Sequence, residues 1–205
     1  MHKKTKGYTL LLLLVLTGLA GRQSTTTITS KERRFLLEQL KESKAGIQKA
    51  VKGLSAEQLS FKVSTEAASI NENLQEIAFT EVFLWNITNA ALKHPSTAQF
   101  SNDAKITDEQ ILAALIPNEK WELPESFQAE KLKWKTTESA LETFKDQRAD
   151  LIKYAKTSTD DMRNYAVKMP FGTVDAYQLL LYISAVTKHH ELQIEEIKSN
   201  PAFPK

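Results

Sequence analysis

Four long segments with the apolar spacing of amphipathic helices constrain the fold of this chain more than any other feature. They span approximately residues 29–54, 69–92, 129–156 and 174–199, and glycine is almost absent from their interiors. Apolar residues recur every three or four positions in each segment, which places them on one face of a helix. No window alternates apolar and polar residues over the length of a β-strand. The sequence therefore predicts an all-α fold, and one apolar stripe per helix predicts a four-helix bundle.

The ends of the segments and their apolar stripes predict the helix boundaries and the core. Thr29 and Glu32 have the spacing of a capping box at the start of the first segment, and Pro95 and Pro201 follow the second and the fourth. The side chains expected to face the core are, in chain order, Leu36, Leu40, Ile47, Val51, Leu54, Ile70, Leu74, Ile77, Leu84, Ala91, Leu132, Leu141, Phe144, Leu151, Ile152, Ala176, Leu180, Ile183, Thr187, His190, Ile194 and Ile197.

The lengths of the connections predict how the helices run. The first and second segments are separated by a short connection, as are the third and fourth, whereas residues 93–128 separate the second from the third. This long connection includes a helical pattern near residues 107–115. It can return the chain to the end of the bundle at which the second helix starts. We therefore expect an up-down-down-up bundle with a crossover between the second and third helices.

Residues 1–20 have the order of a secretory signal peptide: lysines, a short apolar run and small residues. The apolar run is shorter than the roughly 20 residues of a membrane-spanning helix. The alternative to a cleaved signal peptide is an uncleaved N-terminal anchor. The sequence LAGR resembles a bacterial lipoprotein motif, but Arg22 stands where the lipidated cysteine is required. We expect an exported bacterial protein, periplasmic or secreted, with no membrane association after cleavage. Residues 21–29 are expected to form a polar linker, 30–199 the bundle and 200–205 a tail.

Charge and cysteine content exclude several classes of function. The lysines of residues 1–20 account for the positive net charge of +2, so the remaining chain is slightly acidic. The longest basic run outside that segment is KERR, and no aromatic residues interleave with it, so we expect no nucleic-acid partner. The chain contains no cysteine, which excludes disulfides, thiol nucleophiles and thiolate metal sites.

Two stretches carry a family resemblance. LSAEQLSFKVSTEAASINENLQEIAFTEVFLW, residues 54–85, resembles the link and second helix of the DinB-like (YfiT-like) four-helix-bundle family, and MPFGTVDAYQLLLYISAVTKHHELQIEEIK, residues 169–198, resembles its fourth helix. The resemblance implies a metal held by three histidines, one from the second helix and two from the fourth at positions i and i+4. Members of the family include proteins regarded as metal-dependent hydrolases or thiol transferases that act on small molecules.

The resemblance maps those three ligand positions to Glu76, Val186 and His190, so two of the three histidines are replaced. Val186 offers no lone pair. His189 does not replace it, because adjacent residues point about 100° apart around a helix. His94 lies roughly 27 Å along the helix from Glu76, by the rise of about 1.5 Å per residue.

Two interpretations of the remaining pair stay open. Glu76 and His190 could hold zinc, nickel, manganese or iron weakly, with waters completing the coordination. Glu81 and Gln193 are polar residues on the same helices that could contribute. Glu81, however, diverges from Glu76 by about 140° around the helix. Alternatively, they form a hydrogen-bonded pair without a metal. In either case the two residues reach the same level only if the second and fourth helices are antiparallel.

Two functions therefore compete. The first is a non-catalytic exported module, with a degenerate metal site, that binds a small molecule or an envelope protein. The second is a metal-dependent hydrolase or transferase that acts on a small molecule through a substituted Glu/His site, in which an ion would polarise a carbonyl or activate water. No side chain is assigned a catalytic role from the sequence, and a homodimer through an exposed helix face is compatible with both functions.

Overall fold

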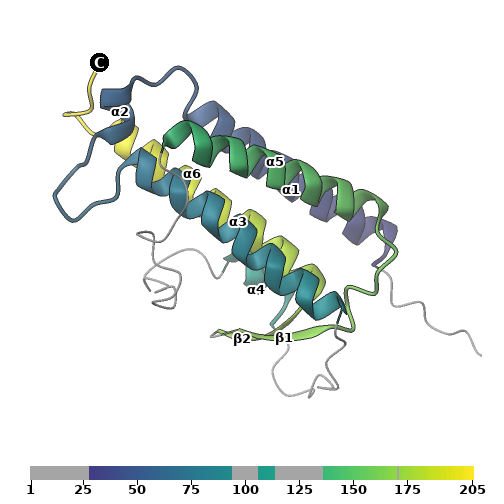
Figure 1. Cartoon of the computed structure of the whole chain (residues 1–205). Helices are drawn as coiled ribbons and strands as arrows, with labels where there is room; N and C mark the ends of the chain where they lie inside the picture. Colours follow the sequence, from purple (N-terminus) through teal and green to yellow (C-terminus); the bar gives the residue numbers. More distant parts are fainter. Residues whose placement is uncertain (1–27, 94–105, 114–135, 170) are drawn as a thin grey trace, which may run out of the picture.

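The computed structural model describes residues 28–93, 106–113, 136–169 and 171–205, and these form a bundle of four long helices (Figure 1). The long helices are α1 (Ser30–Ala50), α3 (Ile70–Lys93), α5 (Thr137–Thr157) and α6 (Ala176–Ser199). Two short helices, α2 (Ala56–Ser60) and α4 (Asp108–Ala113), lie outside this core set. A two-stranded antiparallel hairpin, β1 (Ala166–Met169) and β2 (Gly172–Asp175), leads into α6. The prediction of an all-α four-helix bundle is confirmed.

Each long helix packs against two others, so that α1 and α3 occupy one diagonal of the bundle and α5 and α6 the other. Hydrogen bonds at matching levels give the directions. Helices α1 and α6 are parallel, because the Tyr177 hydroxyl donates to Glu32 O near their starts and Lys198 Nζ donates to Ala50 O near their ends.

Helix α6 is antiparallel to α3, because His190 near the end of α6 contacts Asn73 near the start of α3. Helix α5 is antiparallel to α1, because the Arg33 guanidinium at the start of α1 donates to Ala155 O near the end of α5. The order is therefore up-down-down-up, as the long connection between α3 and α5 predicts.

The predicted apolar stripes form the core. Side chains from all four long helices are fully buried, among them Leu36, Ile77, Phe144 and Leu180. Every predicted inward residue of α6 is buried. Leu54, Ala91, Leu141 and Ile152 are only partly buried, and Leu132 lies outside the described residues.

Helix capping explains the observed boundaries. Thr29 and Glu32 form the predicted capping box of α1, with Glu32 N donating to the Thr29 hydroxyl. Helix α5 begins at Thr137, because the Thr136 side chain caps its first turn. The expected beginning of this helix at residue 129 falls outside the described residues. The predicted helical pattern near 107–115 is present as α4, whose last described residue is Ala113.

Two elements were not predicted. Helix α2 is a single turn capped by Ser55 and Gln58, and the hairpin strands have four residues each. Both elements are too short to produce a clear periodic signal. At the start of β2, Gly172 has a φ of 137°, a conformation that side chains with a Cβ rarely adopt. No helix in the described parts of the chain combines the length and hydrophobicity that a membrane span requires.

Candidate functional site

His190 is the central residue of the predicted site and is almost completely buried between α6 and α3. Its Nδ1 lies 2.8 Å from Asn73 Oδ1. The Asn73 amide nitrogen donates to Ser69 O at 2.9 Å, so Oδ1 is the atom that faces the imidazole as an acceptor. Nδ1 therefore carries the ring proton, and Nε2 keeps its lone pair. A hydrogen bond at one ring nitrogen fixes the tautomer that the other nitrogen presents.

Glu76 approaches this lone pair from α3, one turn after Asn73. Its Oε2 lies 3.8 Å from His190 Nε2, and its side chain is 47% exposed, compared with 9% for His190. The structure therefore brings together the two residues that the sequence singled out. The direct hydrogen bond of the metal-free alternative is not formed, because 3.8 Å exceeds hydrogen-bonding distance. The buried Asn73, which the sequence reading missed, is the direct partner of His190.

The electrostatics of the pair are set by burial. Burial and, after it, the neighbouring His189 lower the pKa of His190 to about 4, although a hydrogen bond with Gln193 acts in the opposite direction. Burial, followed by repulsion from Glu72, raises the pKa of the Glu76 carboxyl above its usual value. His190 is thus neutral at pH 7, and Nε2 accepts hydrogen bonds there.

The other residues considered for this site are directed elsewhere. Val186, four residues before His190, is buried in the apolar core. His189 lines a groove on the α1 side of α6. Glu81 is bound by Arg148 in the centre of the bundle. His94 lies outside the described residues. Within the described parts, no three or more His, Cys, Asp or Glu residues are grouped so that they could hold a metal ion.

A buried ion pair joins all four long helices at mid-height. Arg148 of α5 is completely buried, and the Glu81 side chain of α3 is 1% exposed. The guanidinium donates to Glu81 from Nε at 2.6 Å and from Nη2 at 2.7 Å. It also donates to Leu40 O and the Ser43 hydroxyl of α1 and to the Thr187 hydroxyl of α6. This network satisfies the arginine on every side and keeps Glu81 away from His190.

A second ionic cluster holds α4 against one end of the bundle. The Arg163 guanidinium donates to the carboxylates of Glu32, Asp108 and Asp175, which belong to α1, α4 and the N-cap of α6. It also stacks over the ring of Tyr177, 3.9 Å from the ring centroid. These contacts fix the position of α4 relative to α1 and α6.

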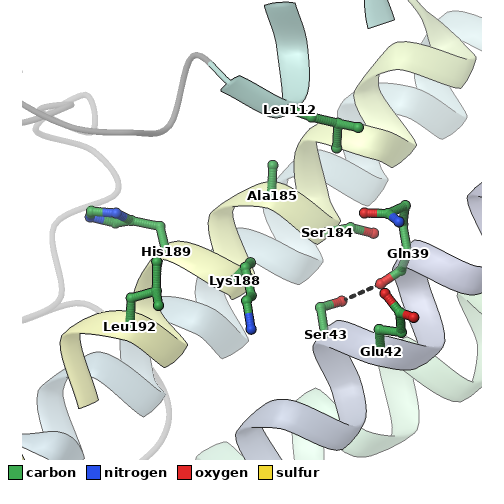
Figure 2. A pocket seen from close by; sticks show the side chains of 9 residues that line it. All are labelled: Gln39, Glu42, Ser43, Leu112, Ser184, Ala185, Lys188, His189 and Leu192. Carbon is green, nitrogen blue, oxygen red and sulfur yellow. Dashed lines mark hydrogen bonds between the residues drawn. The ribbon is translucent and has the colours of Figure 1, made fainter. Parts of the chain in front are cut away.

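Helix α4 forms one side of a groove between α1 and α6 (Figure 2). The groove has a volume of about 270 Å³. Its lining residues are Gln39, Glu42 and Ser43 of α1, Leu112 of α4, and Ser184, Ala185, Lys188, His189 and Leu192 of α6. Glu76 and His190 do not line it, because they meet at the contact between α3 and α6. The groove is therefore separate from the Glu76–His190 pair.

A model of the DinB superfamily matches residues 39–194. The chain belongs to the DinB superfamily. The matched range includes most of α1 and α6 and all of α3 and α5. No curated protein and no solved structure matches the chain.

As a DinB-superfamily bundle, this chain has the antiparallel α3–α6 pair on which the three expected ligand positions lie. The donors at those positions are one imidazole, one half-exposed carboxylate and no third group, because Val186 is a hydrocarbon side chain. This set does not fit a centre of three imidazoles. We therefore derive no metal-dependent step for this site.

Proposed function

We propose that this DinB-superfamily protein is an exported, non-catalytic module that binds a small molecule at the Asn73–His190–Glu76 site. The proposal is supported chiefly by the fixed tautomer of His190, whose Nε2 lone pair faces Glu76 without a hydrogen bond between them. Export is supported by the composition of residues 1–20. Binding without catalysis is supported by the incomplete donor set, which leaves Val186 where the family resemblance expects a ligand.

The geometry favours a ligand with a polar group that donates a hydrogen bond. Nε2 of the neutral His190 is an acceptor at pH 7, and the half-exposed Glu76 gives access from solvent. A group with two donor hydrogens could bond to both acceptors from beside the 3.8 Å gap, because each hydrogen can be directed at one of them. An amine or amide nitrogen with two hydrogens meets this requirement.

A thermal-shift screen of the purified protein against small polar compounds tests the proposal. We expect a hit to raise the melting temperature of the wild type, and we expect Glu76→Gln and His190→Gln to reduce that shift. Glu196→Gln, which alters an exposed carboxylate on the same helix as His190, is the control and should behave like the wild type. A screen without any stabilising compound would contradict small-molecule binding, whereas co-purification with an envelope protein would favour a macromolecular partner instead.

One observation favours a second candidate, the hydrolase or transferase with a substituted metal site. Two ligand bonds of about 2.1 Å at a tetrahedral angle separate the donor atoms by about 3.4 Å, and Glu76 Oε2 and His190 Nε2 are 3.8 Å apart. Elemental analysis of the purified protein and titration with zinc, nickel or manganese distinguish the candidates. Stoichiometric metal that is lost in both Glu76→Ala and His190→Ala would replace our proposal with this one. Absence of uptake would eliminate it.

A further inference from the structure

The groove between α1, α4 and α6 contains a buried hydroxyl without a partner. Ser184 is 2% exposed, and its Oγ forms no hydrogen bond within the described structure. Serine in a helix ordinarily donates to a carbonyl of the preceding turn, as Ser43 does across the groove when it donates to Gln39 O. Figure 2 shows the Ser184 hydroxyl pointing from α6 toward the side of the groove that Gln39 of α1 forms. A buried polar group left unpaired is destabilising, and a ligand in the groove would satisfy it.

The charges around this hydroxyl leave one carboxylate without a counter-ion. Lys188 is paired with Glu191 at 2.9 Å. Glu191 lies directly against α1, where a Cβ at Gly46 would overlap its carboxylate. Glu42 lines the groove and has no ion pair within the described residues. With Lys188 paired to Glu191, Glu42 is the carboxylate of the described groove lining that has no ion pair.

The remainder of the groove is apolar. Leu112 of α4 lies on one side, and Ala185 and Leu192 of α6 lie on the other (Figure 2). Leu192 is 58% exposed, one of few large hydrophobic side chains this exposed in the described structure. At about 270 Å³ the groove lies near the lower end of the usual range of small-molecule sites, roughly 300–1,000 Å³, so its ligand is small.

We propose that this groove binds a small amphipathic primary amine in its protonated form. The ammonium group pairs with Glu42 and donates to Ser184 Oγ, and the alkyl group contacts Leu112, Ala185 and Leu192. This site is separate from the one assigned under the proposed function, because it uses the opposite side of α6 and neither Glu76 nor His190.

Titrations of the purified, isotope-labelled protein with hexylamine, hexanoate and hexanol, followed by amide NMR shifts, test the assignment. The three probes share an alkyl chain and differ in the charge of the polar group. We expect hexylamine to shift residues of the groove, including Ser184 and Ala185. It should bind about 1.4- to fivefold more tightly than hexanol, the range for an ion pair with an exposed carboxylate. Hexanoate should bind more weakly than hexanol, because Glu42 repels it.

Two variants identify the groups responsible. Glu42→Gln should abolish the preference for hexylamine over hexanol, whereas Glu38→Gln, an exposed carboxylate one turn earlier on α1 that does not line the groove, should leave it unchanged. Ser184→Ala should weaken hexylamine binding about two- to tenfold, the range for one hydrogen bond. It should also raise the melting temperature of the free protein, because it removes an unpaired buried hydroxyl.

Several results would overturn the assignment. These are equal binding of the three probes, unchanged hexylamine binding in Glu42→Gln, or a lowered melting temperature of free Ser184→Ala. Hexylamine shifts centred on Asn73 rather than on the groove would also overturn it. That last result would leave the proposed function standing, since it would locate ligand binding at the His190 site.

Discussion

Replacing Arg148 with methionine tests whether the buried ion pair is the electrostatic centre of the bundle. The substitution removes all five hydrogen bonds donated by the guanidinium. Two of the acceptors keep hydrogen bonds of their own: the Ser43 hydroxyl donates to Gln39 O, and the Thr187 hydroxyl donates to Ile183 O. Glu81 is different, because both of the hydrogen bonds that its carboxylate receives within the described residues come from Arg148. The effect of the substitution is therefore concentrated on Glu81.

The magnitude follows from leaving a carboxylate buried and uncompensated. The Glu81 side chain is 1% exposed, and breaking a buried pair by removing one partner destabilises a protein by about 3–5 kcal/mol. That is a large fraction of the roughly 5–15 kcal/mol by which proteins are stable. Replacing both partners with apolar residues removes the uncompensated charge. The double variant Arg148→Met, Glu81→Leu should therefore be within about 2 kcal/mol of the wild type.

Urea unfolding followed by far-ultraviolet circular dichroism and tryptophan fluorescence measures these differences. The free energy of unfolding should fall in each single variant and recover in the double variant, with a coupling energy of at least about 3 kcal/mol. If Arg148→Met does not fold at all, the double variant still provides the measurement. A loss below about 1 kcal/mol in Arg148→Met, or a double variant no more stable than the weaker single variant, would refute the reasoning.

Three further predictions concern His190, Asn73 and Arg163. The pKa of His190 is lowered from 6.5 to about 4 in the folded protein, so the unfolded chain binds more protons between these values, and stability is lost as the pH falls through that window. Urea titrations at pH 4 and pH 7 should measure this loss as the difference in the free energy of unfolding between the wild type and His190→Gln. The wild type should gain about 3 kcal/mol relative to the variant from pH 4 to pH 7. A difference that does not change with pH would contradict the prediction. Asn73→Leu should lower the free energy of unfolding by about 1–3 kcal/mol, because it removes the acceptor for His190 Nδ1. Nitrogen NMR of the His190 imidazole should show that the ring no longer holds a single tautomer. Retention of that tautomer would argue against the role of Asn73. Arg163→Met should accelerate amide hydrogen exchange in α4, because Asp108 loses its ionic contact. The free energy of global unfolding should change by less than about 2 kcal/mol. Unchanged exchange at residues 108–113 would show that other contacts hold α4.

The helices and their order could be predicted from local information. Apolar spacing predicts α1, α3, α5 and α6, because a helix that packs on one side must present its apolar residues at that period. The long connection before α5 predicts the parallel α3–α5 pair. Complementary charges on two inward stripes were also visible: Arg148 lies between Phe144 and Leu151, and Glu81 lies between Ile77 and Leu84. That pattern signals a buried ion pair.

The sequence by itself determined the helical pattern and the absence of thiol chemistry, and its resemblance to the DinB-like family implied that Glu76 and His190 lie together. Only the tertiary structure decided that Asn73 fixes the imidazole tautomer, that Glu81 faces Arg148, and that Ser184 is buried without a partner beside Leu112 of α4. The physical reason is that helical periodicity assigns a residue to a face, whereas a hydrogen bond depends on the rotamer and on the level at which two distant helices meet. Those quantities arise from the packing of all four helices together, and no single segment of the chain encodes them.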